Sequence, residues 1–355
     1  MNPEDVLDDE ETRASVDKSF MSKSLKSFPF HLEKGWELSK HFGLPEMGPV
    51  ADSILLSGMG GSAIGGDIFA DVMRYVGGPL VLVNRTYSAP KGIGKGALHI
   101  AVSYSGNTEE TVSSFMRGLD AGMPSIGISS GGKLEVICRQ RAIPFLRIPG
   151  GEQPRAALGY MLSSLLGIAT RLGFHDFSSD IMDAVQAART ASASVSPEIP
   201  ADRNISKKLA AWIGDSTPLI VATSDIFSAA ERMKTQFNEN SKRFAWLLTI
   251  PESNHNDWIP LQMDPSAGKY RAIMLSNVID EPLLTRRMDV VEHLLSPRMD
   301  VRRIFPMGRN ILTELIRYIV TGDYTSYYLA VLHSTDPTPV APIEILKEEL
   351  GSRIP

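Results

Sequence analysis

The sequence predicts an α/β protein in which parallel sheets are covered by helices on both faces. Short, almost continuously apolar runs, such as residues 54–56 and 98–102, recur along the chain, and stretches with helical spacing separate them. Apolar strands of this kind are typical of sheets that are buried on both sides. Regular alternation of strand and helix brings successive strands into one parallel sheet.

The first alternating region spans residues 53–173. Its predicted strands are 54–56, 80–83, 98–102, 125–129 and 144–148. A loop at 57–66 is predicted to lead into a helix that ends at Tyr75, and the further predicted helices are 111–122, 133–141 and the apolar 154–172. Helices are also expected within 18–42, packed on this first domain.

The alternation restarts after residues 191–203, which are rich in Ala, Ser and Pro and therefore predict a linker. The second set of predicted elements comprises strands 219–222, 245–250, 271–275 and 302–305 and helices 226–238, 282–295, 310–321 and 343–350. Because the two halves share an element order, we expect duplicated α/β domains. The predicted divisions are an N-terminal tail and helices (1–45), a first domain (46–190), a linker (191–204), a second domain (205–335) and a C-terminal tail and helix (336–355).

The composition is that of an ordinary globular enzyme. The chain has 355 residues, 43% of them hydrophobic, and a net charge of −5, which does not favour a nucleic-acid surface. The one cysteine, Cys138, excludes an internal disulfide and a multi-cysteine zinc site. No apolar run approaches the roughly 20 residues needed to span a bilayer. Residues 1–17 are acidic, unlike a targeting peptide, and predict a frayed tail; we expect a cytoplasmic protein that binds no membrane.

The run SYSGNTEET at 103–111 lies between a predicted buried strand and a predicted helix. The hydroxyls of Ser103, Ser105 and Thr108 therefore gather where first-turn N–H groups are unpaired and the helix dipole is positive. Gly106 allows the main chain to approach a ligand closely. This pattern predicts a phosphate-binding loop, and the alternative is a capped helix start without a ligand.

A glycine-rich loop, residues 58–66, follows the first predicted strand. Its G-x-G-x-x-A pattern matches the dinucleotide fingerprint, but Asn84 and Arg85 stand where the acidic ribose ligand is expected. An NADP-dependent oxidoreductase is thus one alternative, and a tight turn that only serves packing is another. Two neighbouring loops that carry hydroxyls suit a small phosphosugar better than a long dinucleotide.

Five motifs occur in a fixed order. They are Gly60-Gly61-Ser62, the run at 103–111, Glu152-Gln153-Pro154-Arg155-Ala156-Ala157, Gln236-Phe237-Asn238-Glu239-Asn240-Ser241-Lys242 and Asn254-His255-Asn256. Together they resemble the bifunctional phosphoglucose/phosphomannose isomerases, which consist of two tandem sugar-isomerase (SIS) domains. The resemblance runs from about residue 53 to the C-terminus. It implies interconversion of glucose 6-phosphate and fructose 6-phosphate, with mannose 6-phosphate as a further substrate, a homodimer, and no metal or organic cofactor.

The same resemblance implies a role for each matched position. Gly60, Gly61 and Ser62 would contact the sugar, and Ser103, Ser105 and Thr108 would hold the phosphate. Arg155 would lie near C1 and C2, Glu239 would be the base, and His255 would assist ring opening from across the dimer interface. A family lysine in the last helix best matches Lys347, and a threonine linked to mannose 6-phosphate use matches Thr338, although Val340 is an alternative alignment.

The chemistry of isomerisation is consistent with these residue types. Moving a proton between C1 and C2 through an enediolate requires one carboxylate that acts as base and then as acid, a role that fits Glu239. A guanidinium, as in Arg155, stabilises the enediolate oxygen without changing its own charge. An imidazole, as in His255, can donate or accept a proton near neutral pH.

Other classes fit the sequence less well. A non-catalytic SIS module that only binds a phosphosugar would need the 103–108 loop but not Glu239, His255 and Lys347 together. A zinc-dependent isomerase is disfavoured because no H-x-H or H-E-x-x-H pair occurs among the seven histidines. The aminotransferring SIS enzymes require a cysteine nucleophile, and Cys138 lies inside a predicted helix.

Overall fold

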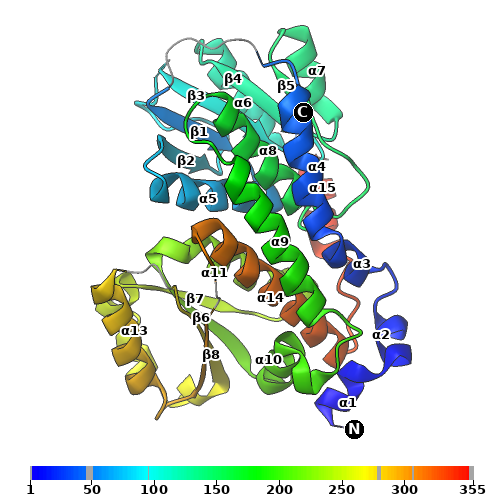
Figure 1. The fold of residues 1–355 in the computed structure, drawn as a ribbon, viewed down its shortest axis with the longest axis vertical. Coiled ribbons are helices and arrows are strands. Elements are labelled where there is room, and N and C mark those ends of the chain that lie inside the picture. Colours follow the sequence, from blue (N-terminus) through cyan, green and yellow to red (C-terminus); the bar gives the residue numbers. More distant parts are fainter. Residues whose placement is uncertain (1, 45–50, 95, 278–280, 306–307, 352–355) are drawn as a thin grey trace.

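The computed structural model contains two parallel sheets joined through a shared helical layer (Figure 1). It describes residues 2–44, 51–94, 96–277, 281–305 and 308–351. No helix in these ranges is both long and apolar enough to cross a membrane.

The first sheet has the strand order β2-β1-β3-β4-β5, all parallel. Its strands are β1 (Ser53–Ser57), β2 (Leu80–Asn84), β3 (Ala97–Val102), β4 (Ser125–Ser129) and β5 (Phe145–Arg147). The helices of this domain are α5 (Gly60–Tyr75), α6 (Glu109–Asp120), α7 (Gly132–Gln140) and α8 (Leu158–Arg171). The central strand β3 is buried at every position, as expected for a sheet covered on both faces.

The second sheet has the order β7-β6-β8-β9, also all parallel. Its strands are β6 (Thr217–Thr223), β7 (Trp246–Ile250), β8 (Tyr270–Leu275) and β9 (Asp300–Ile304). Its helices are α10 (Ile205–Ile213), α11 (Phe227–Gln236), α12 (Trp258–Met263) and α13 (Pro282–Leu295), with short 3₁₀ segments Ala201–Arg203, Ser224–Ile226, Glu252–His255 and Pro265–Lys269. In both sheets the first strand in sequence pairs with the second and third strands, so the predicted similarity of the two halves is confirmed.

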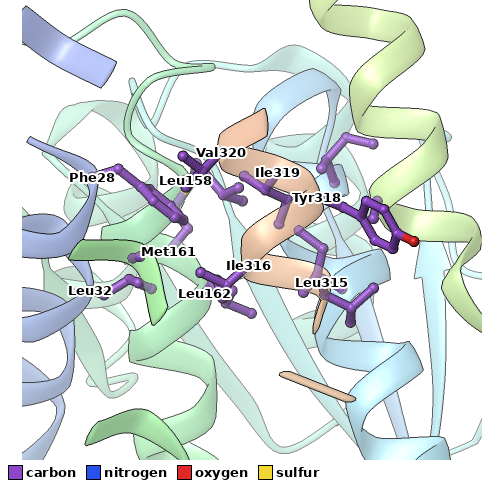
Figure 2. Packing of buried hydrophobic residues seen from close by; sticks show 14 of the residues in the cluster. Phe28, Leu32, Leu158, Met161, Leu162, Leu315, Ile316, Tyr318, Ile319 and Val320 are labelled. Carbon is purple, nitrogen blue, oxygen red and sulfur yellow. The ribbon is translucent and has the colours of Figure 1, made fainter. Parts of the chain in front are cut away.

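One hydrophobic core connects the two sheets through helix α14 (Ile311–Leu332). Figure 2 shows Val320 of α14 next to Leu158 of α8 and Ile316 of α14 next to Leu162 of α8, with Phe28 of α4 (Phe28–His41) near Leu158. α14 also packs along α9 (Ser178–Val195), α10 and α11. The last helix, α15 (Ala341–Gly351), follows it. The sequence predicted an end for α14 at residue 321, which is wrong by three turns, because its apolar character continues to Leu332.

The predicted frayed tail at residues 1–17 is also wrong. The segment forms α1 (Pro3–Asp8) and α2 (Glu10–Val16), followed by α3 (Met21–Lys26). Leu7 is fully buried, and the Asp8 carboxylate accepts a hydrogen bond from Lys207 Nζ at 2.8 Å. Four of the acidic residues that suggested a solvated tail, Glu4, Asp5, Glu10 and Glu11, occupy first turns of helices, where they favour the helix dipole.

Two further predictions need correction. Residues 191–195 of the predicted linker belong to α9, whose small residues Ala191 and Ser192 are buried. Asn204, at the end of that predicted linker, is fully buried and caps α10 by accepting from Lys207 N. The glycine-rich segment is not a loop as far as residue 66, because α5 begins at Gly60.

Candidate functional site

The first two hydroxyl-bearing segments meet at the carboxyl edge of the first sheet. Strands β1 and β3 are neighbours, so α5, which follows β1, starts beside the loop that follows β3. The main-chain N–H of Tyr104 donates to Ser62 Oγ at 3.2 Å, which ties the two segments together. Ligands of open α/β sheets bind at this edge.

The loop between β3 and α6 has the geometry of an anion site. Ser103 is fully buried, and its Oγ donates to Thr108 Oγ1 at 2.9 Å, while Ser105 Oγ accepts from Asn107 N at 3.2 Å. Thr108 is the N-cap residue of α6, but its side chain does not cap the first-turn N–H groups. Those groups and the hydroxyls face the same turn, so an anion placed there gains several donors.

Gly106 is required in this loop for two reasons. Its φ of +70° lies in the left-handed region, and a Cβ there would come within 1.7 Å of the Gly131 carbonyl oxygen. The N-terminus of α7 closes on the same loop, since Lys133 N donates to Asn107 Oδ1 at 3.0 Å. The loop is therefore held in shape by the close approach of the α7 N-terminus, through main-chain contacts and the Asn107 side chain.

Gly61 connects this edge to the second half of the site. A Cβ on Gly61 would lie 2.8 Å from Pro154 O and 3.1 Å from Arg155 Cα. The start of α5 thus rests directly on the main chain of residues 154–155, and only a glycine permits this approach. The glycine-rich motif serves to place Arg155.

Arg155 is buried, at 3% exposed, and its guanidinium is held from several sides. Nε donates to Asn240 Oδ1, and Nη2 donates to the carbonyls of Pro337 and Thr338, each at 2.8 Å. Nη1 lies 3.6 Å from Glu239 Oε2. Burial lowers the pKa of Arg155, and the Glu239 carboxylate opposes that shift. The result is a fixed cation beside a carboxylate.

Glu239 lies on a π-helical turn, Phe237–Ser241, that extends α11. π-helical turns are rare and often occur at functional sites. Its two neighbours anchor the turn, because Asn238 Oδ1 accepts from Ala245 N at 3.1 Å and Asn240 Nδ2 donates to Ser326 Oγ at 2.9 Å. The Glu239 side chain remains 30% exposed, so a substrate can reach it.

Among the described residues, no hydrogen bond or ion pair joins His255 or Lys347 to this cluster. Both are exposed, His255 at the end of the 3₁₀ segment Glu252–His255 and Lys347 on α15. Within the described ranges, neither side chain forms a hydrogen bond or an ion pair. Hydrogen bonds and close contacts join the glycine motif, the phosphate loop, Arg155 and Glu239 into one cluster, and none of these contacts among the described residues extends to His255 or Lys347.

Residues 202–350 match the family model described as the bacterial phospho-glucose isomerase C-terminal SIS domain. A bifunctional phosphoglucose/phosphomannose isomerase of Caldicellulosiruptor bescii is 34% identical over 335 residues, which cover 93% of this chain and 99% of that protein. Three more relatives of the same name are 30–33% identical.

The chain belongs to the bifunctional phosphoglucose/phosphomannose isomerase family. A D-glucosamine-6-phosphate 4-epimerase of Sulfolobus acidocaldarius is also related, at 33% identity over 79% of this chain and 83% of that protein. The crystal structure of a hypothetical protein from Thermus thermophilus shares the fold, with a TM-score of 0.74 and 14% identity over 97% of this chain and 94% of that one.

Several residues of this family member's site were missed at the sequence level. Arg232 Nη2 donates to the Arg155 carbonyl at 2.9 Å and pairs with Asp323 Oδ2 at 2.6 Å. Both charged residues are almost completely buried. A signal existed for Asp323, which interrupts the long apolar run of α14; for Asn240 the only signal was its place in the motif.

The two residues on which the dinucleotide alternative depended, Asn84 and Arg85, bind other side chains of this isomerase-family chain. Asn84 is buried and donates to Ser114 Oγ at 2.9 Å, and the Arg85 guanidinium pairs with Asp67. Burial raises the pKa of Cys138 to about 12, so this thiol is a poor nucleophile. In the described part of the chain, no three His, Cys, Asp or Glu residues gather as a metal site.

Proposed function

We propose that this protein interconverts glucose 6-phosphate and fructose 6-phosphate, and mannose 6-phosphate and fructose 6-phosphate. The observation that carries the proposal is the continuous contact from the phosphate loop to the base. Tyr104 of the loop donates a hydrogen bond to Ser62, Gly61 packs against the main chain of Arg155, and the Arg155 guanidinium lies 3.6 Å from the Glu239 carboxylate. An anionic group held at Ser103, Ser105 and Thr108 would leave the other end of a hexose near the carboxylate.

The residues support an enediolate mechanism. Glu239 would take the proton from C2 of the open aldose, and the same carboxylic acid would return it to C1 as the hydroxyl proton moves from O2 to O1. The negative charge that develops on oxygen would be stabilised by Arg155, whose guanidinium is already fixed by three hydrogen bonds. Gly60, Gly61 and Ser62 would contact the sugar between these two ends.

Mannose 6-phosphate use is assigned to Thr338 rather than Val340. The Thr338 carbonyl accepts from Arg155 at 2.8 Å. Its buried hydroxyl forms no hydrogen bond with any described residue. Because the Thr338 carbonyl holds the guanidinium, its hydroxyl would serve near the C2 region of a sugar, where glucose and mannose differ.

A homodimer in which the partner supplies the histidine is part of the proposal. His255 adjoins a groove of about 450 Å³ whose lining includes Asn254, Trp258, Leu283 and Val290. Leu283 is 62% exposed and Val290 50%, and such apolar side chains gathered on one face are typical of an interaction surface. A second copy seated there would carry His255 toward a neighbouring site, and Lys347 would share the ring-opening step. A cytoplasmic location remains a prediction.

The test is a coupled assay that records glucose 6-phosphate formed from fructose 6-phosphate, repeated with mannose 6-phosphate. Glu239→Gln should lower kcat by about 10²–10⁴-fold while substrate still binds, because general acid–base catalysis is worth that much. The matched control is Glu231→Gln on the preceding helix α11, because among the described residues the Glu231 carboxylate pairs only with Lys234. Absence of turnover in the wild-type protein at high enzyme concentration would contradict the proposal.

Because one relative is named as a 4-epimerase, the same preparation should also be given glucosamine 6-phosphate. Epimerisation at C4 without aldose–ketose conversion would replace the proposed activity with that of the relative. Binding of fructose 6-phosphate without any turnover would instead favour a phosphosugar-binding protein.

A further inference from the structure

Lys242 lies directly after the π-helical turn that carries Glu239. Its backbone is left-handed, with a φ of +56°, and its ammonium folds back to contact the main chain of this π-helical segment. Nζ donates to the main-chain carbonyl of Glu239 at 2.6 Å and more weakly to that of Asn240 at 3.4 Å. A lysine that caps the end of its own helix in this way is a common local arrangement.

The third bond of Lys242 is not local. Nζ also donates to the Pro337 carbonyl at 2.9 Å, across 95 residues of sequence. The same carbonyl accepts from Arg155 Nη2 at 2.8 Å. Two cations from distant parts of the chain therefore share one acceptor in the segment that connects α14 to α15.

Two cations would not converge in this way without compensating charge. The Glu239 carboxylate faces Arg155, and Asp336 and Glu239 both favour the charged form of Lys242. The carbonyls of Glu239, Pro337 and Thr338 supply the remaining acceptors. The base-bearing turn, the guanidinium and residues 336–338 are thus joined into one unit.

We propose that Lys242 is a positioning residue for the isomerisation: it fixes the Glu239 main chain and the Pro337 carbonyl relative to Arg155. This inference rests on the proposed function. Lys242 acts through the main chain, and the Glu239 carboxylate remains free to take the proton.

The charge state of Lys242 gives this role a distinct signature. Partial removal from water, together with the nearby Arg155 guanidinium, lowers the pKa of Lys242 to about 8, although Asp336 and Glu239 oppose the shift. As the pH rises through 8 the ammonium loses a proton, and its charge-assisted bonds to the carbonyls weaken. We therefore expect kcat to fall on the alkaline side of pH 8.

The experiment compares wild type, Lys242→Gln, Lys242→Arg and the control Lys234→Gln, using kcat and KM for fructose 6-phosphate from pH 6 to 10. Lys234 is on α11 and pairs only with Glu231 among the described residues. Lys242→Gln should lower kcat by about tenfold or more and change KM less, because small misplacement of a base is costly. Lys242→Arg should recover much of kcat and lose the decline near pH 8, because Arg stays protonated.

Unchanged kcat in Lys242→Gln, or the same alkaline decline in Lys242→Arg as in wild type, would overturn the positioning role. If Lys242→Gln loses kcat only because it unfolds, its melting temperature will be lowered. In that case the pH dependence of kcat in Lys242→Arg decides whether Lys242 has the positioning role. An inactive wild-type protein would instead refute the proposed function itself, so the two failures are distinguishable.

Discussion

Replacing Gly61 with alanine tests how the first sheet positions Arg155. The new Cβ would lie 2.8 Å from Pro154 O and 3.1 Å from Arg155 Cα. Ordinary contacts of a Cβ begin at 3.4 Å, and the obstructing atoms belong to the main chain. Residues 154–155 must therefore move by about 0.6 Å, and the guanidinium moves with them.

The expected cost follows from that displacement. A shift of about 1 Å in a catalytic group reduces rate roughly 10²-fold, so Gly61→Ala should lower kcat about 10- to 100-fold. Helix propensity works the other way, because alanine is preferred over glycine in helices by up to about 1 kcal/mol. Moving the main chain costs about 1–3 kcal/mol at an overpacked site, and helix propensity offsets part of that cost. The loss of kcat should therefore be larger than the modest fall in melting temperature explains.

Gly65→Ala is the matched control on the same helix. Its Cβ would meet only side-chain atoms, at 3.5 Å from Leu158 and 3.7 Å from Met161. The assay is fructose 6-phosphate turnover together with the melting temperature of both variants. Equal kcat in Gly61→Ala and Gly65→Ala would refute the reasoning that the start of α5 sets the place of Arg155.

Four further outcomes are expected. Arg155→Lys should lower kcat by about 10²–10³-fold, because an ammonium cannot replace the planar fork; near-normal kcat would remove Arg155 from the mechanism. Thr338→Ala should reduce kcat/KM for mannose 6-phosphate more than for glucose 6-phosphate, and an equal loss would argue against a specificity role. Val290→Glu should give monomers by light scattering together with loss of activity, whereas active dimers would place the interface elsewhere. Burial raises the pKa of Asp71 to about 6, so its contribution to stability is full below about pH 4 and is lost as the pH rises through 6. Asp71→Asn should therefore remove up to about 3 kcal/mol of the fall in unfolding free energy between pH 4 and pH 6, measured by urea unfolding. The same pH dependence in wild type and variant would contradict this.

Much of the fold could be predicted because local patterns and tertiary structure agree there. The apolar runs at 54–56 and 98–102 became central strands, and the hydroxyl-rich run after β3 became the loop and start of α6. The acidic segment at 1–17 could not be predicted as helix, because its stability depends on distant partners. Leu7 packs into the core, and Asp8 pairs with Lys207, 199 residues away.

The same distinction applies to the candidate site. Glu239 and Arg155 were predicted from motifs, but their separation of 3.6 Å depends on how α11 and residues 154–155 pack. Arg155 and Lys242 both donate to the main-chain carbonyl of Pro337. Every residue type has such a carbonyl, so the sequence gives no sign of these bonds. For His255 and Lys347, no hydrogen bond or ion pair among the described residues of the single chain links them to the site, so their roles stay predictions from the motifs.

The most direct test of the account is the crystal structure of this protein with a hydroxamate analogue of the enediolate bound. The account predicts the phosphate at Ser103, Ser105 and Thr108, the hydroxamate oxygens within hydrogen-bonding distance of Arg155, and the Glu239 carboxylate beside the carbons that stand for C1 and C2. An analogue bound with its phosphate elsewhere, or with Glu239 turned away from those carbons, would contradict it.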